Sequence, residues 1–454
     1  MRQRTRDAWR QLVGAEAPAS LLPVLYGSGP AGREARAATP VWSRARGPWV
    51  WDTDGRRYLD FVTGFGVAAV GHAHPRVTAA VARQVRRLAH GYGDVHPHEP
   101  RARLAARLAA LAPWPRAHVL WAQSGSEAVE LAWKSAYLAT GRPGVLAFEN
   151  GYHGESVGAL SLTGLPAFRA PFAGLLPRRT VWGPYADCAR CPLGLVFPAC
   201  RFACVGEAFA RADRADRRGP GIGAVLVEPI QGRGGVIVPP PGFLRAVRLE
   251  ARRRRWLLIA DEIYTGLGRT GRLFACEHDG VVPDLLCLGK ALAGGLPLAA
   301  VLGRAAVLAP WRRAASGAEP AHAATFLAHP VSCAAALAAL DVIAAERLPA
   351  RAGRLGRRLR RGLDRLARAH PRIAEVRGRG MLAALAFARS GGAPDPATAR
   401  AVMAAAQAQG LLVLTCGSAG QAVSLTPPLT LTEAQLDDGL RRLDRALEAV
   451  GGRR

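Results

Sequence analysis

The feature that most constrains this chain is a short apolar run that ends in a lysine and a glycine pair. Residues 285–288 are Leu-Leu-Cys-Leu; Gly289 and Lys290 follow, with Gly294 and Gly295 shortly after. Such a run predicts a buried strand that leads into a loop. In open α/β sheets ligands bind beyond the carboxyl ends of the strands, so Lys290 is expected where a ligand would lie.

Lysine is rare in this sequence, and its rarity narrows the chemistry. The chain has 61 Lys and Arg residues, but the only lysines are Lys134 and Lys290. An arginine keeps its proton in a protein and cannot form a Schiff base, so that chemistry requires one of these two lysines. Lys134 lies in the helical pattern of residues 126–137, where we expect it on a solvated face. A lysine on a surface loop is the alternative for Lys290, and its neighbours argue against it.

A second apolar run ends in acidic residues. Residues 256–260 lead into Asp261 and Glu262, and a glycine-rich loop follows. A carboxylate at the end of a strand can keep a pyridine nitrogen protonated. A lysine together with such an acid is the arrangement in which pyridoxal phosphate acts as an electron sink. The sequence therefore predicts that Lys290 and Asp261 serve one site.

These motifs resemble a known family. Residues 261–271 and 283–295 are similar to the class III pyridoxal-phosphate aminotransferases, which include the 4-aminobutyrate, ornithine and ω-amine transaminases. The resemblance extends over about residues 40–445. It implies an α/β fold of PLP fold type I, with a large domain around a mostly parallel, seven-stranded sheet. A smaller α+β domain would come from both chain ends.

Three segments are expected from this resemblance. Residues 1–70 would form an N-terminal arm and a hairpin that belong to the small domain. Residues 71–340 would form the large PLP-binding domain, and residues 341–454 the C-terminal small domain. Within the first segment, Asp54-Gly55 between apolar runs predicts a β-hairpin. In the last segment we expect a pair of strands at residues 381–387 and 411–415.

The resemblance also implies roles for single residues. Lys290 would hold the cofactor and then act as the general base, and Asp261 would keep the ring nitrogen protonated. Gly125 and Ser126 would bind the phosphate, for which the free N–H groups at a helix N-terminus are suited. An ordinary Ser-x-x-Glu helix cap is the alternative meaning of residues 124–127.

Five more residues are implied to contact the cofactor. Tyr152 would stack on the pyridine ring, because a flat π-face holds a flat ring. Ile263 would pack under that ring, and Tyr264 would bond its phenolic oxygen. Glu228 ends a predicted buried strand in a segment that the family shares. Thr325 would contact the phosphate of the neighbouring subunit, so a homodimer is implied.

Three positions depart from the 4-aminobutyrate transaminases. Those enzymes carry arginine at the positions of Glu155 and Ser424, and glutamate at the position of Arg233. A serine cannot replace a bidentate arginine–carboxylate contact, and Glu155 would favour a cation. We therefore expect an amine, diamine or amino-sugar donor and a keto-acid acceptor, whose carboxylate Arg233 could hold. The alternative is that Glu155 and Arg233 point into solvent.

Other functions stay open at this point. A 4-aminobutyrate- or ornithine-like transamination, a decarboxylation, or an amine shift within one molecule would use the same scaffold. A rival of another class is a non-catalytic protein that binds a metal cluster or a polyanion. The presence of Lys290 and Asp261 together with Gly125-Ser126 argues against that rival.

A group of four cysteines stands apart from these motifs. Cys188 and Cys191 have Cys-x-x-Cys spacing, and Cys200 and Cys204 follow with a spacing one residue longer. In a chain expected to be cytosolic, such spacing points to metal binding more than to disulfides. We expect either a structural zinc or iron–sulfur site, or an insertion with reduced thiols.

The net charge of +27 would ordinarily indicate a nucleic-acid partner. The arginines are spread along the chain, however, and in residues 354–366 they form the polar face of an amphipathic helical pattern. We therefore expect no specific nucleic-acid binding. No apolar run is long enough to span a membrane, and no secretory signal is evident, so we expect a cytoplasmic protein.

Overall fold

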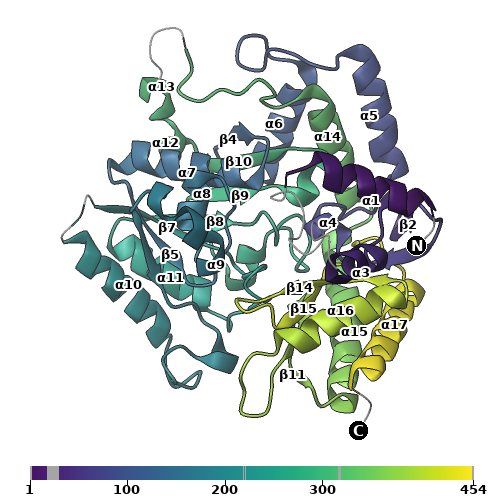
Figure 1. The fold of residues 1–454 in the computed structure, drawn as a ribbon. Helices are drawn as coiled ribbons and strands as arrows, with labels where there is room; N and C mark the ends of the chain where they lie inside the picture. Colours follow the sequence, from purple (N-terminus) through teal and green to yellow (C-terminus); the bar gives the residue numbers. More distant parts are fainter. Residues whose placement is uncertain (1–2, 18–29, 218, 220, 315–318, 452–454) are drawn as a thin grey trace.

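A seven-stranded sheet forms the centre of the structure. The structure is a computed structural model, and it describes residues 3–17, 30–217, 219, 221–314 and 319–451. The strand order is β4-β10-β9-β8-β7-β5-β6 (Figure 1). Neighbouring strands pair in parallel except at β10, which is antiparallel to both β4 and β9. The strands are β4 (Ala117–Ala122), β5 (Gly144–Phe148), β6 (Thr180–Gly183), β7 (Ile222–Val227), β8 (Leu257–Asp261), β9 (Leu285–Leu288) and β10 (Ala299–Arg304).

Helices cover both faces of this sheet, so its strands are apolar on both sides. Along β9, Leu285 and Cys287 join a core cluster with residues of α7 (Gly125–Thr140), whereas Leu286 and Leu288 join the main core. Burial on both faces is typical of a mostly parallel sheet. The longer helices of this part are α5 (Pro75–Arg87), α6 (Glu99–Leu111), α10 (Ala203–Asp216), α11 (Phe243–Arg253) and α14 (Pro330–Ala345).

The two ends of the chain meet in a smaller α+β part. Strands β1 (Trp42–Arg46), β2 (Trp49–Asp52) and β3 (Arg57–Asp60) are antiparallel neighbours, and β13 (Leu411–Leu412) pairs in parallel with β3. Figure 1 shows α3 (Pro30–Ala38) beside α16 (Pro396–Ala408), and Gln407 donates a hydrogen bond to the carbonyl of Ala38. The remaining long helices are α1 (Gln3–Ala15), α15 (Leu348–Ala369) and α17 (Glu433–Gly451).

The predicted fold class is confirmed by this architecture. The predicted hairpin is also present, since β2 and β3 flank Asp54-Gly55. The division of the chain after residues 70 and 340 stays a prediction. Of the predicted arm, residues 1–2 and 18–29 lie outside the described residues, as do residues 452–454 at the other end.

The predicted pair of C-terminal strands is wrong in its pairing. Residues 382–387 form β12, which pairs with β11 (Ile373–Arg379) and β15 (Ala422–Leu425). The second predicted strand is divided between β13, in the sheet with β3, and β14 (Leu414–Cys416), which pairs with β15. A strand adopts the partner that buries its apolar face, and that partner is not visible in local sequence.

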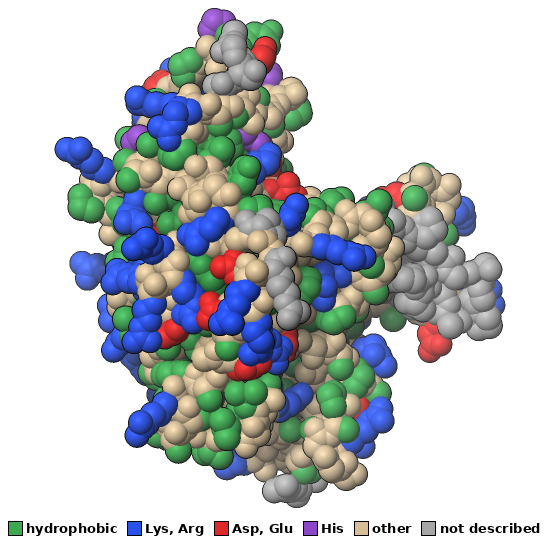
Figure 2. Space-filling view, turned by 90° about the vertical axis from the view of Figure 1, so that its left-hand side faces the viewer, with side chains coloured by type: hydrophobic (Ala, Val, Ile, Leu, Met, Phe, Trp, Pro, Cys, Tyr) green, Lys and Arg blue, Asp and Glu red, His purple; other side chains and the backbone are tan. Residues whose placement is uncertain are grey.

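Basic side chains are distributed over the surface. Figure 2 shows one face of the molecule, on which Lys and Arg side chains are spread and acidic side chains lie among them. Some arginines have acidic partners, as where Arg358 contacts Asp437 at 2.6 Å and Glu433 at 3.0 Å. Within the described ranges, no helix combines the length and the apolar character needed to cross a membrane.

Candidate active site

A cavity of about 440 Å³ opens at the carboxyl ends of β4, β5, β7, β8 and β9. Loops that follow these strands supply most of its wall, as expected for a ligand site in a sheet of this kind. With the exception of Thr325, all of the predicted cofactor and substrate residues line it. They are Gly125, Ser126, Tyr152, Glu155, Glu228, Arg233, Asp261, Ile263, Tyr264, Lys290 and Ser424.

Lys290 reaches the cavity from a strained backbone. Its φ is +41°, in the left-handed region that side chains other than glycine rarely adopt, and such strain is concentrated at functional sites. Its Nζ lies 4.4 Å from the centre of the Tyr264 ring. Burial lowers the pKa of Lys290, an effect that the carboxylates of Asp261 and Glu228 partly oppose. A lowered pKa favours the neutral amine, the form that attacks an aldehyde.

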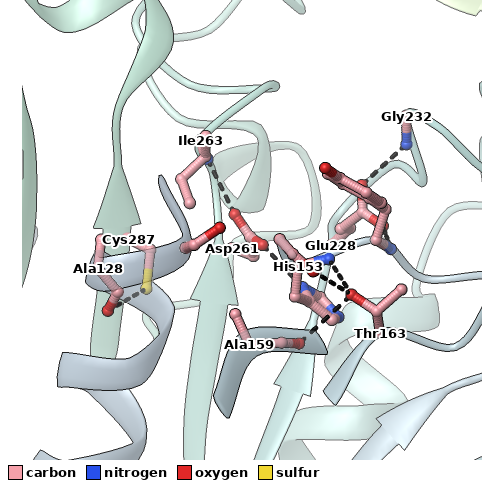
Figure 3. A network of polar contacts seen from close by, with 12 residues as sticks. Ala128, His153, Ala159, Thr163, Glu228, Gly232, Asp261, Ile263 and Cys287 are labelled. Carbon is pink, nitrogen blue, oxygen red and sulfur yellow. Dashed lines mark hydrogen bonds and ion pairs between the residues drawn. The ribbon is translucent and has the colours of Figure 1, made fainter. Parts of the chain in front are cut away.

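Asp261 is held in one orientation by two donors. The backbone N–H of Ile263 donates to Oδ1 at 3.1 Å, and Nδ1 of His153 lies 2.7 Å from Oδ2. Since a carboxylate can only accept, the Nδ1 of His153 carries the proton. Both side chains are buried, and Figure 3 shows His153 and Ile263 on opposite sides of the Asp261 carboxylate. This arrangement can fix a negative charge at the end of β8.

The contact of His153 with Asp261 has no signal in the sequence. His153 follows Tyr152 in the loop after β5, and it is 108 residues away from Asp261 in the chain. Its backbone N–H donates to Oγ1 of Thr163 at 3.0 Å, which holds the loop in place. A lone histidine between an aromatic residue and a glycine carries little information by itself. The contact becomes visible only once the order of the strands is known.

The start of α7 offers hydrogen-bond donors to the cavity. Ser124 caps the helix, because its Oγ accepts from the N–H of Glu127 at 3.2 Å. The Glu127 carboxylate reaches back one residue further than in a capping box, to the N–H of Gln123 at 2.7 Å. The N–H groups of Gly125 and Ser126 have no partner within the helix, as at any helix start. Such an end suits an anionic group such as phosphate.

Two glycines keep this helix end accessible. A Cβ atom on Gly125 would lie 3.2 Å from the Ile263 side chain, and one on Gly154 would lie 2.0 Å from the Oγ of Ser126. Gly154 also has a φ of +124°. Close approach of the Gly154 loop to the start of α7 therefore requires glycine at position 154, and Gly125 lets Ile263 lie against the helix start without being displaced.

We expect Gly154→Ala to lower the free energy of unfolding by about 3 kcal/mol, because overpacking adds to backbone strain. Gly391→Ala is the matched control: Gly391 has a φ of +87°, but a Cβ there would meet nothing within 4 Å. That variant should lose only about 1 kcal/mol, from strain alone. Urea unfolding of both purified variants measures the difference. Equal losses would mean that the Ser126 contact does not matter.

Glu228 supports the loops around the cavity. Its two oxygens accept from the N–H groups of Tyr152 and Gly232, each at 2.9 Å. Burial raises the pKa of Glu228 to about 7, so the protonation state of this carboxyl changes near neutral pH.

The Tyr264 hydroxyl donates to Oγ1 of Thr426 at 3.4 Å. The predicted bond from Tyr264 to a phenolic oxygen stays a prediction.

The predicted metal residues lie elsewhere. Cys188, Cys191, Cys200 and Cys204 line one small pocket, and all four are free thiols. Burial raises the pKa of Cys204 to about 11, so without a metal this thiol keeps its proton at neutral pH. In the described part of the chain, no three Cys, His, Asp or Glu side chains are arranged to hold a metal ion. This arrangement gives the predicted zinc or iron–sulfur site no support.

Comparison with known proteins agrees with the geometry of the cavity. The class-III aminotransferase family model matches residues 31–447. The 4-aminobutyrate aminotransferase of Mycobacterium leprae is 39% identical over 422 residues, which cover 90% of this chain and 91% of that protein. The 5-aminovalerate aminotransferase of Pseudomonas aeruginosa is 37% identical over 414 residues, which cover 90% and 94% of the two chains.

A solved structure is similar over the same range. The crystal structure of an amine transaminase from an uncultivated Pseudomonas species, in its PLP-bound form, matches with a TM-score of 0.85 and 32% identity. The match covers 94% of this chain and 97% of that one. Because the likeness runs through nearly the whole sequence and fold, this chain belongs to the class III, pyridoxal-phosphate-dependent aminotransferases.

Proposed function

We propose that the cavity binds pyridoxal phosphate and that Lys290 and Asp261 are the residues that use it, in moving an amino group from a primary ω-amine to a 2-oxo acid. The observation that carries this proposal is the convergence of Lys290 with the Asp261–His153 pair on one cavity. When bound, the cofactor supplies an electron sink for the carbon that loses its proton.

The residues of the cavity fit this cofactor at each of its ends. The N–H groups at the start of α7 would hold the phosphate, and the Asp261 carboxylate would pair with the protonated ring nitrogen. Tyr152 and Ile263 line the same cavity and would cover the two faces of the ring. A Cβ on Gly125 would meet Ile263 at 3.2 Å, so glycine lets Ile263 lie directly against the helix start.

Lys290 would have two tasks. Its Nζ would hold the cofactor. Lys290 would also be the general base that takes the proton from the donor carbon carrying the amine and returns it later in the reaction. The donor would leave as a carbonyl compound, and a 2-oxo acid would accept the amino group.

A half-reaction screen would test this function. Purified enzyme loaded with cofactor would receive one donor at a time: 4-aminobutyrate, 5-aminovalerate, ornithine, diamines, amino sugars and simple amines. We expect the cofactor band to convert to its aminated form with at least one ω-amine, and the donor to leave as a carbonyl compound. Release of carbon dioxide, or an isomerised amine, would indicate decarboxylation or an amine shift instead. No conversion with any donor would contradict the proposal.

We also propose a homodimer in which Thr325 reaches the cavity of the partner subunit. Thr325 is exposed and lies outside the cavity of its own subunit. Next to it Phe326 is 53% exposed, and its ring lies 5.3 Å from that of His90, close to the exposed Tyr92. A surface rich in exposed rings suits a subunit interface.

We further propose a cytoplasmic location, which the free thiols of the cysteines support.

The scarcity of lysine allows a direct test of Lys290. Incubation of the apoprotein with pyridoxal phosphate, followed by borohydride reduction, should attach the cofactor to Lys290 and leave Lys134 unmodified. Lys134 is exposed and therefore serves as an internal reference. Because burial lowers the pKa of Lys290, its neutral amine persists to lower pH, and labelling should set in below the ordinary pKa of 10.5. Peptide mass spectrometry measures both sites; preferential labelling of Lys134 would contradict the assignment.

A further inference from the structure

The start of α7 already holds a negative charge that belongs to the protein. Glu127 directly follows Gly125 and Ser126, whose N–H groups would hold the phosphate. Its carboxylate turns back past the end of the helix, where Oε2 accepts from the N–H of Gln123 at 2.7 Å. A helix N-terminus attracts anions, but a second anion at the same end is repelled by the first. A phosphate can therefore bind well here only if the carboxylate is compensated.

A histidine from a distant segment supplies this compensation. Nε2 of His322 lies 3.2 Å from Oε1 of Glu127, although 195 residues separate the two in the chain. Since a carboxylate can only accept, Nε2 carries the proton. In the part of the chain that the structure describes, no other group is hydrogen-bonded to Oε1, and no lysine or arginine pairs with Glu127. The two side chains are only 19% and 23% exposed, so water and salt screen their contact only in part.

His322 is also tied to α7 by a second contact. Trp311, in α13 (Trp311–Ala314), donates from Nε1 to Oγ of Ser135 on α7 at 3.0 Å. The rings of Trp311 and His322 meet edge-on, with centres 6.5 Å apart. Both neighbours of the imidazole are thus anchored on the same helix. His322 itself does not line the cavity, so it can act on a bound cofactor only through Glu127.

We propose that His322 is a positioning residue for the cofactor, which holds and compensates the Glu127 carboxylate so that the start of α7 stays attractive to a phosphate dianion. This inference rests on the proposed aminotransferase function, in which that helix start binds the phosphate of pyridoxal phosphate. The expected effect is confined to the phosphate, because the groups that would contact the ring lie in the cavity and His322 lies outside it.

Pyridoxal phosphate and pyridoxal, which lacks the phosphate, test this proposal with one variant. In the full-length apoprotein, His322→Ala should raise the Kd of pyridoxal phosphate about tenfold, the order expected for one uncompensated like charge near a protein surface. The same variant should leave the Kd of pyridoxal unchanged. Titration followed by absorbance measures both constants without any turnover.

A second substitution separates the charge from the packing. In Glu127→Gln, the amide oxygen can still accept from the N–H of Gln123, as a glutamine does in a capping box, but the negative charge is gone. Glu127→Gln combined with His322→Ala should therefore return the Kd of pyridoxal phosphate to that of the unchanged protein. If His322 served only to hold its own segment in place, removing the charge of Glu127 would repair nothing.

His370→Ala is the matched control. It removes the histidine of another histidine–carboxylate pair, in which Nε2 lies 2.7 Å from Asp444, and neither residue lines the cavity. We expect no change in the Kd of pyridoxal phosphate. If His322→Ala weakened pyridoxal and pyridoxal phosphate alike, or if the double variant stayed weak, the inference would be overturned and the aminotransferase function left intact. An unchanged apoprotein that binds no pyridoxal phosphate would overturn the proposed function, and this inference with it.

Discussion

Lys290→Ala should reduce turnover by at least about 10⁴-fold, because the variant loses the group that holds the cofactor and also the general base, which by itself contributes about 10²- to 10⁴-fold. No other lysine can take over. Lys134, the only other one, is exposed on α7 and does not line the cavity. Steady-state transamination with an accepted donor and a 2-oxo acid measures the loss.

The control for this prediction is Lys134→Ala, which should keep turnover close to that of the unchanged enzyme. A folding defect in Lys290→Ala is separated from a chemical one by adding a small primary amine. If Lys290 moves the proton, such an amine should restore part of the proton transfer in a dose-dependent manner. A Lys290→Ala variant that still turns over at a rate near that of the unchanged enzyme would contradict the assignment.

The main residues of the site could be predicted because each is placed by a local signal. Asp261 ends one apolar run, and Lys290 lies two residues after another. The carboxyl end of a strand in a parallel sheet faces the ligand site, whichever strands lie next to it. Ser124 caps α7 as its spacing to Glu127 predicts. In these cases, a few adjacent residues determine the position, and the fold only has to bring the strand ends together.

The contacts between loops could not be predicted in this way. His153 meets Asp261 because β7 alone lies between β5 and β8, and this order is a property of the whole sheet. Arg233 reaches the carbonyl of Thr415, which is 182 residues further along the chain. The sequence shows that Arg233 replaces a glutamate of the 4-aminobutyrate transaminases, but the carbonyl that positions it comes from another part of the fold. The split between β13 and β14 has the same origin.

The Glu155 contact lies between these two cases. Tyr152 and Glu155 are only three residues apart, so their hydrogen bond is local, and the charge of Glu155 already predicted a preference for cations. The link from Tyr152 through Phe168 to Arg233 depends on tertiary structure. The sequence therefore reveals the two unusual charges, and only the fold shows that both side chains, although exposed, line the same cavity.

Asp261→Asn should lower turnover by about 10²- to 10³-fold, the effect of removing one preorganised charge from a buried site. The amide cannot keep the ring nitrogen protonated. It also cannot accept from both His153 and the N–H of Ile263, since one of its two ends is a donor. A buried donor would lose its acceptor, so the free energy of unfolding should fall by about 1–3 kcal/mol as well.

These two consequences of Asp261→Asn can be separated with a cofactor analogue that is methylated at the ring nitrogen. The analogue carries a fixed positive charge, so it does not need the carboxylate to stay charged. If Asp261 acts through that charge, the analogue should restore part of the turnover in Asp261→Asn and leave its unfolding free energy unrepaired. His153→Ala keeps the carboxylate but removes one of its donors, so its loss should be smaller, about tenfold. Turnover lost equally in both variants, without recovery on the analogue, would mean that the pair serves the fold and not the chemistry.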